Sequence, residues 1–190
     1  DLSMLDIGGF ETIEFLRGSH ESASGSSAVI NFIPKLAYKN NANFYQRFGT
    51  YNTGSYHTGF SLGNNQLSIG YSIGGGRSRQ FYKNIKDADI DTELGNKSIS
   101  IGYKPFFNAE LKYYQLNNSR RYNNYFNKDS IGSRLLMETI KLDFDNSEAG
   151  DLEVYVSTQH TTGQDKVDQL QTDREDNQFT TGLNYLFPLD

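Results

Sequence analysis

Four acidic residues at alternate positions are the first feature of this sequence that could do chemistry. They are Asp87, Asp89, Asp91 and Glu93, in the pattern D-x-D-x-D-x-E. Alternate side chains of an extended segment point to one side, and Ca²⁺ prefers several oxygen ligands. The segment is not an EF-hand, because Thr92 stands where that loop requires glycine and Ser98 where it requires glutamate. Two interpretations remain open: a Ca²⁺ site in an outer loop, and a solvated acidic loop.

Arginine and aromatic residues gather in a second hydrophilic stretch. They are Arg120, Arg121, Tyr122, Tyr125 and Phe126. Arginine binds carboxylates and phosphates through its planar fork, and aromatic rings attract cations and flat groups. We therefore predict a loop that binds an anionic, ring-bearing ligand. The alternative is a loop whose side chains pack on one another.

Other chemistry has little support in the residue types. The chain has no cysteine, and its three histidines lack the spacing of a zinc site. The serine-rich stretch 19–27 holds no G-x-S-x-G elbow, and the glycines of 70–76 end a strand pattern instead of opening a helix. A net charge of −5 offers no basic face to nucleic acid. We expect no enzyme, no nucleic-acid partner and no cofactor beyond the Ca²⁺ considered above.

Segments with alternating apolar and polar side chains carry these residues, and such alternation predicts β-strands. The clearest case is the hairpin 96–116, which turns at Pro105 and Phe106. Eight strands are expected after residue 40, namely 42–51, 55–62, 66–75, the two arms of 96–116, 138–145, 151–159 and 178–187. Two further short strands are expected at 10–17 and 28–33. The fold class predicted is an all-β, antiparallel up-and-down meander.

The connections between these strands alternate in length. Short turns are expected at 63–65, 105–107 and 146–150, and long hydrophilic links at about 77–95, 117–137 and 160–177. All the long links would then emerge at one end of the meander, as in outer-membrane β-barrels. The mean hydropathy of −0.65 and the lack of an 18-residue apolar run exclude a transmembrane helix. They do not exclude a membrane barrel, whose strands are half polar.

The side chains on these strands favour the same interpretation. Aromatic residues collect near the short turns, where a barrel has an interfacial girdle: Tyr103, Phe106, Phe107, Phe144, Tyr185 and Phe187. Charged residues stand on the face opposite the aliphatic ones: Glu110, Lys112, Lys141, Asp143 and Glu153. Charges that line a hydrated lumen, or that pair across strands, avoid the cost of burial in an apolar core.

A motif near the N-terminus resembles a known family. Residues 11–18 read ETIEFLRG, 25–28 read GSSA and 29–35 read VINFIPK. In this order and spacing they resemble the end of the plug domain of TonB-dependent outer-membrane transporters, I-E-x-I-E-V-L-R-G-P, then Y-G-S, then G-G-V-I-N-I-I-T-K. The residues that carry the resemblance are Glu11, Glu14, Arg17, Gly18, Gly25 and Asn31. Ser19 and Ser24 depart from the family's proline and tyrosine.

The resemblance implies a plug-like segment at 1–38 and transmembrane β-barrel strands at 39–190. About eight strands would be present here, out of the 22 of the family's barrel. It implies the bacterial outer membrane as location and no covalent chemistry. The implied partners are the TonB complex, outer-membrane lipid and lipopolysaccharide, and a scarce nutrient such as a ferric siderophore or cobalamin. The chain would be the end of a plug and the first third of a barrel.

Two other interpretations remain open. One is a self-standing eight-stranded outer-membrane barrel with a role in adhesion or envelope structure. The other is a soluble, lipocalin-like binding barrel whose apolar face points inward. The orientation of the strands separates these interpretations. The apolar face points outward in the two membrane barrels and inward in the soluble barrel.

Overall fold

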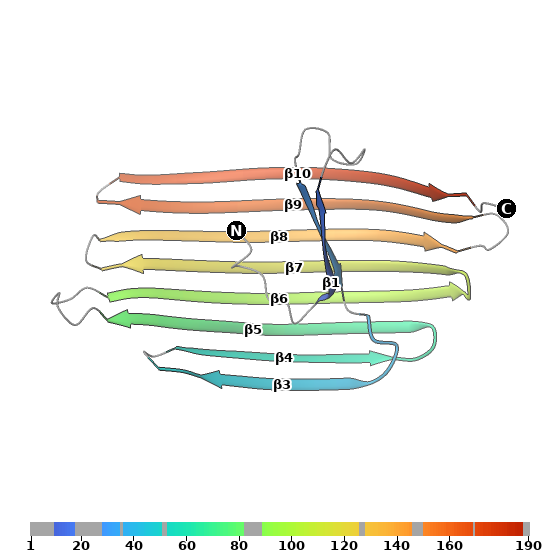
Figure 1. Ribbon diagram of the computed structural model, residues 1–190, viewed down its shortest axis with the longest axis horizontal. Helices are drawn as coiled ribbons and strands as arrows, with labels where there is room; N and C mark the ends of the chain where they lie inside the picture. The colour runs from blue at the N-terminus through green and yellow to red at the C-terminus, as the bar shows by residue number, and fades with distance from the viewer. Residues whose placement is uncertain are drawn as a thin grey trace.

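The computed structural model describes residues 10–17, 28–34, 36–50, 53–81, 89–125, 128–145, 150–168 and 170–187. Every regular element in these ranges is a β-strand (Figure 1). The strands are β1 (Phe10–Arg17), β2 (Ala28–Pro34), β3 (Asn41–Phe48), β4 (Gly54–Gly63), β5 (Leu67–Phe81), β6 (Asp89–Phe106), β7 (Ala109–Asn124), β8 (Asp129–Phe144), β9 (Asp151–Val167) and β10 (Leu170–Leu186). No helix in the described ranges is long and apolar enough to cross a membrane.

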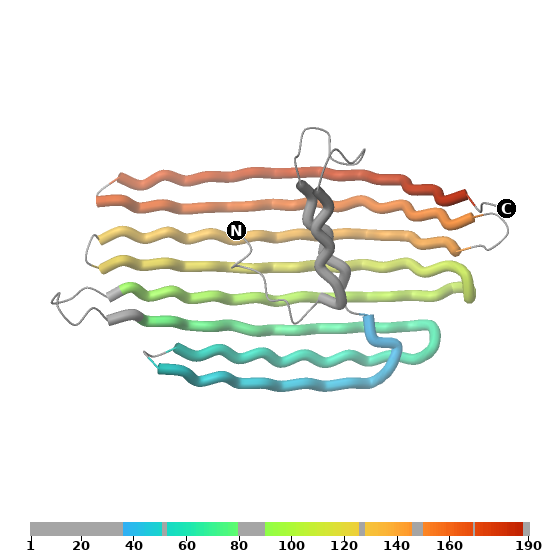
Figure 2. The backbone as a smooth tube through the Cα atoms, in the orientation of Figure 1, coloured from blue at the N-terminus to red at the C-terminus, as the bar shows by residue number. Residues whose placement is uncertain are grey.

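Strands β3 to β10 form one eight-stranded sheet in sequence order. Each strand pairs antiparallel with its neighbour along the chain, so the sheet is an up-and-down meander (Figures 1 and 2). The sheet is open, because β3 and β10 each pair with only one strand among the described residues. The predicted all-β meander of eight strands is confirmed.

The three links that were predicted as long loops are mostly strand, so that prediction is wrong. β5 runs on to Phe81, and β6 begins at Asp89. β7 and β8 are joined by residues 125–128, and β9 and β10 by 168–169 alone. Alternating polarity identifies a strand only where one of its faces is apolar. These segments carry polar side chains on both faces, so the alternation that would have identified them as strands is absent. Within the strands their backbones are nevertheless paired, and Lys128 and Asp168 take positive φ in the turns.

The two short N-terminal strands are also confirmed. β1 and β2 pair antiparallel, which sets Glu14 opposite Asn31 and Arg17 opposite Ala28. Glu11 lies on β1 at a register shift, while Gly18 and Gly25 lie outside the described residues. The chain leaves the two-stranded sheet at Pro34 and enters the eight-stranded sheet at Asn41. The division into a plug-like part at 1–38 and barrel strands at 39–190 stays a prediction.

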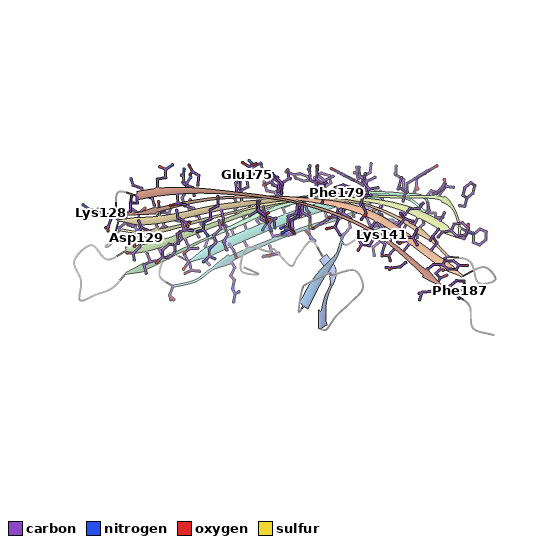
Figure 3. All side chains as sticks on the ribbon, turned by 90° about the horizontal axis from the view of Figure 1, so that it is seen from above. Lys128, Asp129, Lys141, Glu175, Phe179 and Phe187 are labelled. Atoms are coloured by element: carbon purple, nitrogen blue, oxygen red, sulfur yellow. The ribbon has the colours of Figure 1, made fainter. Side chains whose placement is uncertain are left out.

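The register aligns aliphatic residues of neighbouring strands in two rows on one face of the sheet. One row is Leu67, Tyr103, Leu111, Leu142, Val154 and Leu183. The other is Leu62, Ile69, Ile101, Tyr113, Ile140, Val156 and Thr181. We call these rows the apolar band. The sheet bows along its strands, with Phe179 of the band's face on the convex side and Lys141 on the concave side (Figure 3).

Aromatic residues border the apolar band at both ends. The lower aromatic belt lies at the short turns and holds Phe106, Phe107, Phe144, Tyr185 and Phe187. The upper aromatic belt lies on the far side of the band and holds Phe44, Tyr56, Phe60, Tyr71 and Phe179. Rings touch within each belt, with centroids 4.5 Å apart for Tyr185–Phe187 and 5.5 Å for Phe60–Tyr71.

The sheet has almost no core of its own. Among the described residues only Ala109, Tyr114 and Leu116 are buried hydrophobic residues, whereas most of the apolar band is exposed. The accessible surface is 13375 Å². A compact monomer of 21.5 kDa is expected to expose about 9,200 Å². Stable domains cover each apolar face with another layer, so this convex face requires a cover from outside the sheet.

Candidate functional site

A ladder of alternating charges crosses the concave face near the short turns. Lys112 Nζ lies 3.2 Å from Glu110 and 2.7 Å from Asp143, and Lys141 Nζ lies 3.3 Å from Asp143 and 2.6 Å from Glu153. The register produces it, because Glu110, Asp143 and Glu153 stand opposite one another in one row and the two lysines in the next. Of the two arrangements considered for these charges, the structure shows pairing across neighbouring strands. We call these five residues the charge ladder.

The segment 36–40 lies across the concave face and joins this ladder. The Tyr38 hydroxyl donates to Glu110 Oε1, and Lys104 Nζ lies 4.2 Å from the centre of the Tyr38 ring. Ser68 Oγ donates to the Ala37 carbonyl at 3.0 Å, and Ser61 Oγ to the Lys39 carbonyl at 3.1 Å. These contacts fasten the segment to β4, β5 and β7.

Two features adapt the site to Tyr38. A Cβ on Gly102 would lie 2.5 Å from the Tyr38 hydroxyl, so β6 needs a glycine where the tyrosine crosses it. Burial, and then the hydrogen bond to Glu110, raise the pKa of the Tyr38 phenol above its usual range. Tyr38 therefore remains a proton donor to Glu110 at any physiological pH. No local pattern marked Tyr38, because its partner is 72 positions away along the chain.

A second ion pair lies beyond the apolar band, where β5 and β6 approach their far ends. Arg77 donates from Nε and Nη2 to the two carboxylate oxygens of Asp91, at 3.1 and 2.5 Å. The Asp91 side chain is almost fully buried, and Arg77 is half exposed. The hydrogen bond from Arg77, against the opposing effect of burial, holds the pKa of Asp91 below its usual value. Glu93 lies 3.9 Å from the same guanidinium.

This pairing bears on the predicted Ca²⁺ ligands. Asp91 and Glu93 lie on strand β6, not in a loop, and Asp91 is held by Arg77. Asp89 begins β6, and Asp87 lies outside the described residues. Within the described ranges no three acidic or histidine side chains form a group that could hold a metal. The Ca²⁺ site stays a prediction.

The predicted cluster of arginine and aromatic residues is divided between the two faces. Arg120 and Tyr122 lie on β7 and share the concave face with Ser100 and Asn118 by strand alternation. Arg121 points to the convex face. Tyr125 lies in the turn that follows, and Phe126 lies outside the described residues. Arg120, Arg121 and Tyr122 therefore lie on a paired strand and not in the loop assumed for them, and their role in ligand binding stays a prediction.

A hollow of the convex face was not foreseen from the sequence. It has a volume of about 380 Å³ and is lined by Tyr56, Ile73, Gly74, Gly95, Asn96, Lys97, Asn117, Ser119 and Arg134. It lies at the border of the upper aromatic belt. We call it the convex hollow. Its residues come from five strands, β4 to β8, so only the register brings them together.

No protein-family model, no curated protein and no solved structure matches the chain.

Proposed function

We propose that this chain forms part of the wall of an outer-membrane β-barrel, in a TonB-dependent receptor that takes up a scarce nutrient such as a ferric siderophore or cobalamin. The observation that carries the proposal is the convex face, on which two aromatic belts flank an aliphatic band. Lipid-facing barrel surfaces have this composition, with aromatic girdles at both interfaces of the bilayer.

The dimensions of the band support a lipid cover. From Lys97 to Phe106, β6 has ten residues between the upper polar region and the short turn. A transmembrane β-strand needs about 9–11 residues. The remaining residues of β5 to β10 are polar on both faces and would extend the wall beyond the bilayer on the outer side. A soluble barrel is disfavoured, because it would have to close with the apolar band inside and the charge ladder outside. The sheet bows in the opposite sense, with the band's face on the convex side and Lys141 on the concave side (Figure 3).

A wide lumen is favoured over a self-standing eight-stranded barrel. The interior of an eight-stranded barrel is just wide enough for side chains. Here the segment 36–40, with its own backbone, lies on the concave face and bonds to Ser61, Ser68 and Glu110. A barrel that holds such a segment inside needs more strands, and the open edges of β3 and β10 provide places for them.

The concave face would line the path of the nutrient. Arg120 and Tyr122 lie on that face beyond the level of the band, where an anionic, ring-bearing ligand would enter. Closer to the short turns, Tyr38 and the charge ladder hold the chain that follows the plug-like segment against the wall. A pull from the TonB complex on the plug would act on this attachment first. Selectivity comes from contacts, and no covalent step is involved.

Spin labels would test the lipid-facing wall. The chain has no cysteine, so single cysteines can be placed at Thr139, Ile140, Val156 and Ser157 without background labelling. In phospholipid vesicles, labels at 140 and 156 should collide with dissolved oxygen, and labels at 139 and 157 with a water-soluble nickel complex. Equal exposure of all four to the nickel complex, or a monomer that stays soluble without detergent, would contradict the proposal.

A further inference from the structure

The convex hollow has the charge of an anion site. Lys97 is exposed, and within the described residues it makes no ion pair. Arg134 is exposed as well, and its Nε donates to Asn117 Oδ1 at 3.2 Å, which orients the guanidinium. No acidic side chain lines the hollow. Two cations and an amide therefore surround a space of about 380 Å³. Carboxylates, namely Glu93, Asp173 and Glu175, line only the larger adjoining hollow, which Arg134 also borders.

The floor and one wall of the hollow are formed by backbone and by a ring. Gly95 and Ser119 stand opposite each other at its floor. Tyr56 forms the wall, because its ring lies against Gly75, where a Cβ would be 3.0 Å from Cε1. Small residues on β5, β6 and β7 thus leave room for a ligand between the tyrosine on one side and Arg134 on the other.

The position of the hollow determines what kind of anion it suits. On β6, Lys97 stands two residues from Ile99 and four from Ile101, on the same face. On β8, Arg134 stands two residues from Leu136 on that face. Lys97 therefore lies two rows, and Arg134 three rows, beyond the nearest row of the apolar band, at the level of the upper aromatic belt. A ligand with its anionic group in the hollow would extend its remaining length over aliphatic side chains.

We infer that the convex hollow binds the phosphate headgroup of a lipid, whose acyl chains lie along the apolar band. Phosphate suits a pair of exposed cations with an adjacent amide, and Arg is the side chain that binds phosphate by two parallel hydrogen bonds. The inference rests on the proposed membrane location and adds to it a specific lipid partner on the outside of the wall. A lipid is proposed over inorganic phosphate, because inorganic phosphate would fill the hollow and leave the apolar band exposed.

The test compares lipids that differ only in phosphate. The full-length protein in detergent is equilibrated with diphosphoryl lipid A or with its phosphate-free analogue, and bound lipid is counted by native mass spectrometry. We expect the phosphorylated lipid to bind at least tenfold more tightly. Lys97→Gln with Arg134→Gln should remove this preference, and raised salt should weaken it. Lys166→Gln, an exposed cation of the same face near the β9–β10 turn, should leave it unchanged.

Each contrary result has a definite meaning. Equal binding of both lipids, an unchanged preference in the double variant, or competition by inorganic phosphate at the lipid's concentration would overturn the inference. Insertion into vesicles and heat-modifiable migration are measured first on every variant. Insertion without a phosphate preference overturns the lipid site alone, whereas failure of the unmodified protein to insert overturns the lipid site and the proposed function together.

Discussion

Adjacent residues of this sheet serve opposite sides of the molecule. Arg120 and Arg121 have the same chemistry and neighbouring positions, yet the strand sends the first to the concave face and the second to the convex face. Thus a cluster that looks continuous along the chain is separated by the thickness of the sheet. In the proposed barrel, any role in nutrient binding belongs to Arg120, which lies on the concave face.

The arginine pair gives the first prediction. Arg120→Ala should weaken binding of an anionic nutrient by roughly 10- to 100-fold, because a hydrogen bond to a charged group contributes about 1.5–3 kcal/mol. Arg121→Ala is the matched control and should bind like the unmodified protein. Calorimetry with a catecholate siderophore, a hydroxamate siderophore and cyanocobalamin would measure this. If Arg121→Ala weakened binding as much as Arg120→Ala, the assignment of faces would be wrong.

Tyr38 gives a second prediction at the same scale, through its ionisation. Because folding raises the pKa of Tyr38, its contact with Glu110 contributes stability in full below the usual tyrosine pKa of about 10. That stability is lost as the pH rises through the raised pKa. In an alkaline absorbance titration, the difference between the unmodified protein and Tyr38→Phe should show a tyrosine that ionises after most of the others. Ionisation of this group near pH 10 would show that the contact is absent.

The strands extend past the apolar band as paired ribbons, and ion pairs stabilise these extensions. On β5 and β6 the pair of Arg77 with Asp91 buries a carboxylate in a region polar on both faces. Surface ion pairs usually contribute little, but this carboxylate is almost fully buried and receives two hydrogen bonds. A buried carboxylate without its partner would be strongly unfavourable.

Acid should therefore loosen the far ends of β5 and β6. The folded pKa of Asp91 is depressed, so the pair contributes stability above the usual pKa of about 3.9 and loses it as the pH falls through the lower folded value. Hydrogen exchange at residues 77–79 and 90–93 should show less protection at pH 2.5 than at pH 5. In Asp91→Asn, protection at pH 5 should already be reduced by about 1–2 kcal/mol. A variant as protected as the unmodified protein would show that the pair does not hold the ribbon.

At the scale of the molecule, the open sheet needs both a cover and neighbours. One face is largely aliphatic and exposed, the other carries the charge ladder, and in the described ranges each of the two edge strands is paired on one side only. Exposed edges invite pairing with further strands. A wide membrane barrel meets these requirements together, since lipid covers the band and additional strands occupy the edges.

Cysteine pairs would decide between a wide barrel and an eight-stranded one. In a closed eight-stranded barrel, β3 and β10 would be neighbours, and some pairing of Ala42→Cys or Phe44→Cys with Phe179→Cys or Thr181→Cys would come within the 4.4–6.8 Å that a disulfide requires between Cα atoms. We expect no such crosslink within a monomer. Thr158→Cys with Phe179→Cys, which stand opposite each other on β9 and β10, is the positive control. Any β3–β10 crosslink in a monomer would favour the small barrel.

The sequence by itself determined that eight strands follow one another in this order, and where the half-apolar part of each strand lies. Alternation of side chains has a period of two in any strand with one apolar face, and it marked part of each of the eight strands, including the parts of β4 to β10 that carry the apolar band. It also located the short turns and the aromatic residues beside them. Local pattern was sufficient because each of these features depends on residues close together along the chain.

Only the tertiary structure decided which side chains meet across strands. The hydrophilic segments around Arg77, Arg120 and Thr162 carry no alternation, so only backbone pairing identified them as strand. Tyr38 meets Glu110, and Lys97 and Arg134 border the same hollow, because the register between strands aligns them over long separations. Register is a property of paired backbones, and a one-residue shift would send every one of these side chains to the other face.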